Sequence, residues 1–178
     1  MTHLADMAIL VCYSGFVRSS AMALTKTKAS DVARYLILLA SAEAEPEYLS
    51  PMRLQKLLYY VQGWHLARTG LPMFSDRIEA WARGPVVPSV WREYRDKGTR
   101  IIFPEGLANP NLSDADKKFV ESVWSAYKGF SAISLSEMTH GETPWKETRG
   151  NLPPEASCKR VIDTDRMKRF FEACDKGA

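Results

Sequence analysis

The sequence is poor in the residues that build metal sites and disulfide frameworks. It contains 3 cysteines among 178 residues, and Cys12, Cys158 and Cys174 form no C-x-x-C pair. An odd number of isolated cysteines predicts neither a disulfide framework nor a zinc site, and it is typical of a protein of the reducing cytoplasm. We therefore expect no bound metal and a cytoplasmic location.

Motifs for nucleotide binding and for common catalytic centres are also missing. Neither G-x-x-x-x-G-K-[ST] nor G-x-G-x-x-G occurs, so no glycine-rich phosphate loop is indicated. The histidines lie outside H-E-x-x-H and similar spacings, and no G-x-S-x-G surrounds a serine. We expect no cofactor and no enzymatic activity. The alternative is a small hydrolase or nuclease that uses His65 or His140, although His65 shares a helix face with Leu58 and Val61, which favours a core histidine.

A strong excess of charge and a long hydrophobic run are absent as well. The net charge of +3 permits an acidic partner but does not supply the basic stripe of a dedicated nucleic-acid binder, so a DNA-binding autoregulator stays an alternative. The apolar run from Met7 to Val17 is too short to span a bilayer, and no lysine or arginine precedes it as in a secretion signal. Residues 1–28 are predicted to be an N-terminal extension: a disordered arm, a packed helix or a start placed upstream of Met22.

Residues 29–178 are predicted to form one α+β domain that is mostly helical and has a small β element of two or three strands. Capping residues and apolar periodicity predict the helices. Ser30, Ser50 before Pro51, Ser113 with Asp116, and Ser134 are expected to cap four of them. Ser89 is expected to open a short helix, and a final helix is expected to follow Asp163 or Thr164. Ser134 and Glu137 have the spacing of a capping box. Strands are expected within Met73–Arg83 and at Ile101–Phe103, and Gly84–Pro88 is expected to be a turn.

The segment from Leu54 to Gly98 is the most distinctive part of the sequence. It joins a helix with a tyrosine pair and Trp64-His65 to the segment Ile78–Trp81, to Gly84-Pro85-Val86-Val87-Pro88 and then to an Arg-Tyr-Arg helix. This order of residues resembles the Panacea family, which comprises SocA-like and phage-associated GepA-like antitoxins of bacterial toxin–antitoxin systems. The resemblance runs from Ala29 to Phe171 and is weaker at Leu135–His140 with Pro144-Trp145.

The resemblance implies a function in protein binding. An antitoxin of this kind would bind a cognate protein toxin and neutralise it, either by occlusion or as a proteolytic adaptor that delivers the toxin to a ClpXP-type AAA+ protease. Neither route needs a cofactor, a membrane or nucleic acid. The sequence leaves the identity of the toxin and the oligomeric state open.

Aromatic and arginine residues of the Leu54–Gly98 segment are the candidate partner-binding residues, because Trp, Tyr and Arg anchor protein interfaces. A rigid turn that exposes two valines would add an apolar edge, and the arginines could steer an acidic toxin. The candidates are Tyr60, Trp64, Trp81, Arg83, Val86, Val87, Arg92, Tyr94 and Arg95. Core packing remains the alternative for each aromatic residue.

Overall fold

The computed structural model describes residues 27–45 and 48–176, so the N-terminal extension expected over residues 1–28 lies almost wholly outside the described residues. Within these ranges there are seven α-helices: α2 (Ala29–Ser41), α3 (Pro51–Thr69), α4 (Pro88–Tyr94), α5 (Asp114–Tyr127), α6 (Ala132–Gly141), α7 (Thr143–Arg149) and α8 (Thr164–Lys176). The other elements are β1 (Glu79–Trp81), β2 (Gly84–Val86) and the 3₁₀ turn η2 (Arg95–Lys97). The prediction of a mostly helical α+β fold is confirmed.

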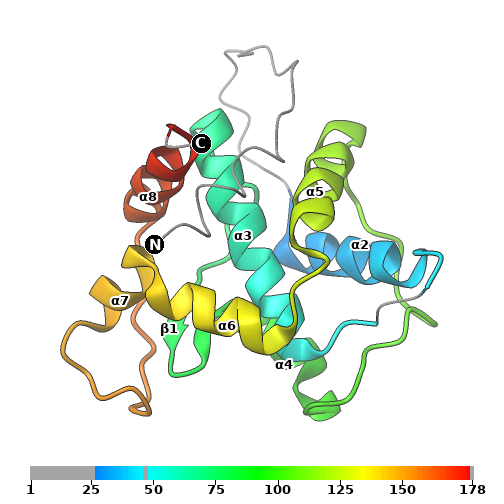
Figure 1. Cartoon of the computed structure of the whole chain (residues 1–178). Helices are drawn as coiled ribbons and strands as arrows, with labels where there is room; N and C mark the ends of the chain where they lie inside the picture. Colours follow the sequence, from blue (N-terminus) through cyan, green and yellow to red (C-terminus); the bar gives the residue numbers. More distant parts are fainter. Residues whose placement is uncertain (1–26, 46–47, 177–178) are drawn as a thin grey trace.

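Helix α3 runs through the centre of the molecule, with α8 on one side and α2 and α5 on the other (Figure 1). It begins as predicted, because the side chain of Ser50 accepts a hydrogen bond from the backbone N–H of Arg53 at 3.3 Å. It ends at Gly70, whose φ of 77° is left-handed. Every residue from Leu54 to Leu66 is buried, so α3 has no solvent-facing stripe.

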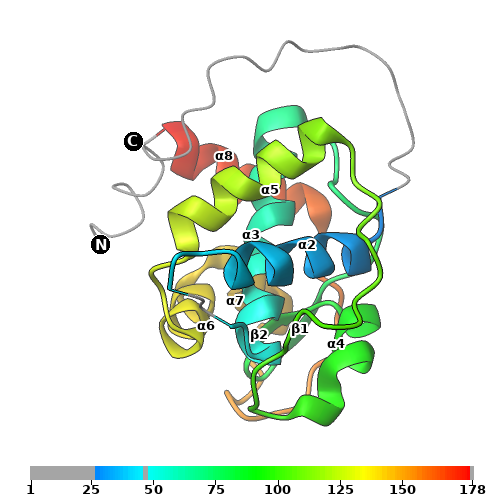
Figure 2. The same ribbon diagram turned by 90° about the vertical axis from the view of Figure 1, so that its right-hand side faces the viewer.

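Helices α2, α4, α5, α6 and α8 all contact α3. Helices α2 and α5 contact each other as well as α3, and α6 lies against both α3 and β2 (Figure 2). Helix α8 approaches α3 so closely that a Cβ added to Gly63 would lie 2.1 Å from the ring of Phe171. No helix of the described part is both long and apolar enough to cross a bilayer.

Several predicted helix starts are confirmed, α4 begins one residue before the predicted Ser89, and the predicted caps of α2 and α6 are wrong. Ser113 caps α5 by accepting from the N–H of Asp116 at 3.1 Å. Helix α6 begins earlier than predicted, because Ser131 and not Ser134 accepts the capping hydrogen bond. Helix α2 begins at Ala29, whose N–H donates to the carboxylate of the distant Asp76 at 3.0 Å, so a tertiary contact replaces the expected local cap at Ser30.

The β element is a single hairpin. Strand β1 pairs antiparallel with β2, and Glu79 lies opposite Val86 in the register. The expected turn over Gly84–Pro88 is therefore wrong, since Gly84–Val86 forms a strand and the chain reverses at Ala82–Arg83. The strand expected at Ile101–Phe103 is reduced to one bridge between Leu49 and Ile102.

Candidate functional site

The candidate partner-binding residues divide into two groups by burial. One group is buried in the protein core and consists of Tyr60, Trp64, Val86, Val87 and Tyr94. The other group keeps part of each side chain exposed and consists of Trp81, Arg83, Arg92 and Arg95. A buried side chain cannot touch another protein unless the fold opens, so only the second group forms a surface in this structure.

Tyr60 and Trp64 belong to a buried hydrogen-bonded network. The hydroxyl of Tyr60 donates to the carboxylate of Glu142 at 2.9 Å, and its ring stacks on Tyr127 with the centroids 4.1 Å apart. The hydroxyl of Tyr59 donates to the same carboxylate at 2.7 Å. The indole N–H of Trp64 donates to the hydroxyl of Tyr127 at 2.9 Å. The network ties α3 to α5 and to the junction of α6 and α7. Tyr60 and Trp64 therefore stabilise the fold and do not contact a partner in this structure.

No sequence pattern predicted the burial of two ionisable side chains, Glu142 in this network and Lys56 on the same helix α3. Burial raises the pKa of Glu142 from 4.5 to about 7, although the tyrosine hydrogen bonds act in the opposite direction. Burial lowers the pKa of Lys56 from 10.5 to about 7, and its Nζ donates to the carbonyl of Pro85 at 3.2 Å. Lys56 lies on the helix face opposite the stripe of Leu54, Leu58 and Val61, and both faces are buried. The signal for its burial is the aromatic face of the same helix, which leaves no polar stripe.

The hairpin folds its valines inward. Val86 is 6% exposed and Val87 is fully buried, so the expectation that a rigid turn exposes them as an apolar edge is wrong. The physical reason is that β2 packs on α3 and α6. The N–H of Val87 donates to the side chain of Gln55 at 2.7 Å, which holds the start of α4 against α3.

A pair of tryptophans forms the centre of the exposed group. The rings of Trp81 on β1 and Trp91 on α4 meet edge to face, with their centroids 5.1 Å apart, and both are only partly buried. The guanidinium of Arg95 lies 5.9 Å from the centroid of Trp91, within cation–π range. Arg92 is exposed on α4, and Arg83 is exposed in the hairpin turn. We call these five residues the tryptophan–arginine surface.

Contacts with Glu79 and Trp145 fix the position of Trp81. Its indole N–H donates to the carboxylate of Glu79 at 2.7 Å, and Arg77 forms an ion pair with that carboxylate at 2.9 Å. Its backbone carbonyl accepts from the indole N–H of Trp145 at 2.9 Å. An aromatic side chain that is held in place before binding loses little conformational entropy when a partner covers it.

His65 is a hydrogen-bonded core histidine, as the sequence analysis favoured. Its Nδ1 lies 2.7 Å from the carbonyl oxygen of Leu71 and 3.2 Å from the hydroxyl of Thr69. Burial lowers its pKa. In the described part of the chain its ring is hydrogen-bonded to no carboxylate, so it is not arranged with an acidic orienting group.

His140 stacks on Trp145 with the ring centroids 4.3 Å apart. Its pKa is lowered, first by burial and then by the neighbouring cations Lys56 and Arg149. Its Nε2 is buried and has no hydrogen-bond partner among the described residues. Those residues also include no group of three or more His, Cys, Asp or Glu side chains that could hold a metal ion.

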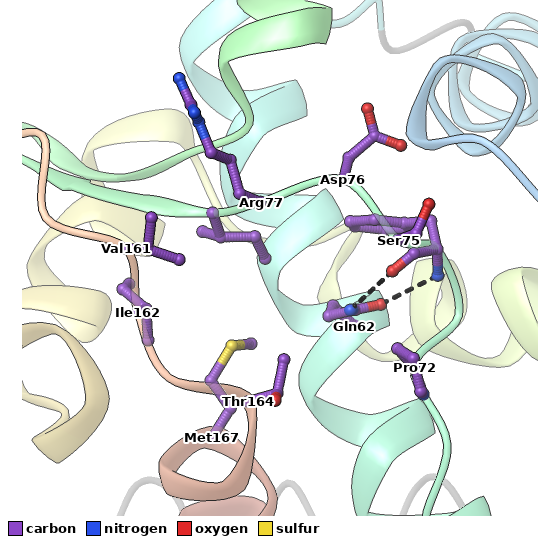
Figure 3. A pocket seen from close by; sticks show the side chains of 11 residues that line it. Gln62, Pro72, Ser75, Asp76, Arg77, Val161, Ile162, Thr164 and Met167 are labelled. Carbon is purple, nitrogen blue, oxygen red and sulfur yellow. Dashed lines mark hydrogen bonds between the residues drawn. The ribbon is translucent and has the colours of Figure 1, made fainter.

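A hollow of about 220 Å³ opens between α3, the segment 72–78 and the chain at 161–167 (Figure 3). Most of its lining is apolar, and the side chains of Asp76 and Arg77 point away from it. The amide of Gln62 is occupied, because it donates to the carbonyl of Phe74 at 3.0 Å and accepts from the N–H of Met73 at 2.9 Å. The hollow therefore offers apolar contact and no arranged acid–base pair.

Comparison with known proteins gives the family. The sequence model of the family described as "Antitoxin SocA-like, Panacea domain" matches residues 54–146, just over half of the chain. The chain belongs to this family. The match contains most of α3, the hairpin, α4 and the whole tryptophan–arginine surface.

One curated relative of this SocA-like antitoxin domain is the antitoxin SocA of Caulobacter vibrioides (strain NA1000 / CB15N). The two sequences are 36% identical over 77 residues, which make up 43% of this chain and 41% of the relative. The similarity thus spans less than half the length of the curated relative. No solved structure matches the chain.

Proposed function

We propose that this protein is an antitoxin that binds a cognate protein toxin directly, and that the tryptophan–arginine surface is a principal contact. The observation that carries the proposal is the family match over residues 54–146, since that segment forms the whole of this surface. The bound toxin would be neutralised by a stoichiometric complex and not by catalysis. The two histidines support this view, because one is a core residue and the other packs on a tryptophan.

The composition of the surface suits a protein partner. Tryptophan and arginine are enriched among the residues that dominate binding energy, and Trp81 is already held in place by its own contacts. Arg92 forms no ion pair in the described part of the chain, and Arg95 pairs only with the exposed Asp96 at 3.6 Å. These cations remain available to attract an acidic toxin surface over a distance.

Two modes of neutralisation remain within this proposal. Occlusion would leave the toxin intact in a complex, whereas an adaptor would deliver it to a cytoplasmic AAA+ protease of the ClpXP type. Both modes require a toxin interface, and the adaptor mode requires a second one for the protease. They differ in one observable, because only the adaptor mode lowers the amount of toxin in the cell.

Co-expression with the product of the neighbouring gene tests the proposal. We expect restored growth, a complex on gel filtration, and either a constant or a falling toxin level according to the mode. A His65→Ala/His140→Ala variant that is folded by circular dichroism should protect equally well. Protection without a complex, or protection lost in this folded variant, would instead support the hydrolase or nuclease alternative. A shift of operator DNA by the protein alone would support the autoregulator.

A further inference from the structure

We propose that the segment after α4 carries a second binding site, which takes a peptide with one large apolar side chain flanked by carboxylates. The site is a hollow of about 410 Å³ lined by Lys97, Thr99, Arg100, Ile101 and Phe103, which we call the 97–103 hollow. It is formed by the last residue of η2 and the loop that follows, which come after the tryptophan–arginine surface in the sequence. The proposal does not depend on the identity of the toxin.

The backbone holds two apolar side chains of this hollow outward. The N–H of Ile102 donates to the carbonyl of Leu49 at 2.8 Å, and Ile102 is 1% exposed. Because successive side chains of an extended chain point in opposite directions, Ile101 and Phe103 face solvent and are 40% and 49% exposed. They are two of the five exposed large hydrophobic side chains in the described residues, and they stand two positions apart.

Tyr48 positions Phe103, the aromatic residue that lines the hollow. The ring of Phe103 lies against Tyr48, with the centroids 5.0 Å apart and the planes tilted by 58°. This contact covers one part of Phe103 and leaves the rest open. A large apolar side chain from a partner could therefore pack between Ile101 and Phe103 and bury surface that is now exposed to water.

The two cations of the hollow have no acidic partner in the described part of the chain. Neither Lys97 nor Arg100 forms an ion pair there. Arg100 is instead held by main-chain oxygens, since its Nη2 donates to the carbonyl of Asp96 at 3.0 Å and its Nε to that of Lys97 at 3.3 Å. Carboxylates next to an apolar anchor would complement the two cations that line the same hollow as the two apolar side chains.

Nucleic acid is the other polyanion to consider, and the structure favours a peptide. A nucleic-acid backbone is bound by a run of cations, whereas two cations line this hollow and the net charge of the chain is only +3. Ile101, a branched aliphatic residue, provides no stacking platform for a base, while it packs well against an apolar side chain.

The test uses the full chain, two-dimensional NMR of its backbone amides, and an acetylated, amidated pentapeptide Asp-Glu-Phe-Asp-Glu. We expect the peptide to shift the amides of residues 97–103 at low salt, with affinity at least about tenfold lower for Asp-Glu-Gly-Asp-Glu and for Lys-Arg-Phe-Lys-Arg. Lys97→Glu/Arg100→Glu and, separately, Ile101→Ser/Phe103→Ser should each weaken binding about tenfold. Because all four residues are exposed and none belongs to the core, these variants are expected to fold.

Matched controls keep the result interpretable. Lys118→Glu/Arg169→Glu makes the same charge change on other exposed positions, and Ile133→Ser removes another exposed isoleucine; neither should affect the peptide. The proposal is overturned if the 97–103 amides do not move or if the glycine peptide binds as well as the phenylalanine peptide. Stronger binding of oligo-dT than of the acidic peptide at the same amides would also overturn it and assign the hollow to nucleic acid.

Discussion

Glu142 and Lys56 place two ionisable side chains inside the protein, and burial shifts their pKa values in opposite directions. Each value moves to about 7. For Glu142 the folded state holds the proton more tightly than the unfolded state, so its contribution to stability is complete below pH 4.5 and is lost as pH rises to about 7. For Lys56 the contribution is complete above pH 10.5 and is lost as pH falls to about 7.

Replacing Glu142 with glutamine should flatten the acid side of this pH dependence. A shift of the pKa from 4.5 to about 7 corresponds to about 3 kcal/mol, which the wild type should lose as pH rises from 4.5 to about 7 and the variant should not. Urea unfolding of both proteins across this range measures the difference. Parallel curves for wild type and variant would show that Glu142 does not titrate in this window.

Replacing Lys56 with methionine should change how the free energy of unfolding depends on pH above about 7. The wild type should gain stability as pH rises above about 7, because the buried ammonium loses its charge in the folded state. The variant should lack this gain and should differ most from wild type below pH 7. Urea unfolding between pH 6 and about 9.5 measures it, and a gain of the same size in Lys56→Met would contradict the assignment.

Gly84 lies where neither its backbone nor its surroundings accept a side chain. Its φ is 98°, and an added Cβ would lie 2.6 Å from Nζ of Lys56 and 2.8 Å from Oγ1 of Thr139. Gly84→Ala should therefore lower the free energy of unfolding by about 2–3 kcal/mol. Gly98→Ala is the matched control, because Gly98 also has a positive φ but faces open space. If Gly84→Ala and Gly98→Ala lower the free energy of unfolding equally in thermal or urea unfolding, crowding at Gly84 contributes nothing to the cost.

At the scale of elements, the fold depends on how closely α8 can approach α3. Gly63 allows this approach, since Phe171 occupies the space where a Cβ would lie. Gly63→Ala should destabilise by about 3 kcal/mol despite the better helix propensity of alanine. In a Phe171→Ala background the same change should cost far less, and urea unfolding of the four proteins gives the coupling energy. Additive losses would show that the two residues do not interact.

Capping residues in the sequence predicted helix ends correctly where the cap is a neighbour in the chain. Ser50 with Pro51, Gly70, and Ser113 with Asp116 all lie where capping rules place them, and the corresponding helices have the expected ends. The start of α2 was missed because its cap comes from Asp76, which is 47 residues away in sequence. Helix α7 (Thr143–Arg149) is only seven residues long and was not predicted.

The candidate site was predictable only in part, for a related reason. Residue type identifies aromatic and arginine side chains that suit an interface, but burial depends on what packs on both faces of an element. Tyr60 and Trp64 lie on a helix surrounded by others, so they became core, whereas Trp81 and Arg92 lie on elements with one side open. The burial of Glu142 depends on contacts between α3 and α6, which are distant in sequence.

At the scale of the whole molecule, the chain is a member of the SocA-like Panacea-domain family and is built on one central helix. Lys56 and Gln55 of that helix hydrogen-bond to Pro85 of the hairpin and to Val87 at the start of α4, and these two elements together present Trp81 and Trp91 as a pair. The interior thus accounts for stability, and the tryptophan–arginine surface is our proposal for the toxin contact. The two roles are separable, because exposed arginines can be changed without touching the core.

The most direct test of that proposal is the kinetics of toxin binding by Arg92→Glu/Arg95→Glu, measured by surface plasmon resonance at several salt concentrations. If these arginines steer an acidic toxin, association should slow by about tenfold or more and lose most of its salt dependence. The control Lys118→Glu/Arg169→Glu carries the same charge change at exposed positions and should bind like wild type. Unchanged association by the folded Arg92→Glu/Arg95→Glu variant, with its salt dependence intact, would contradict the account.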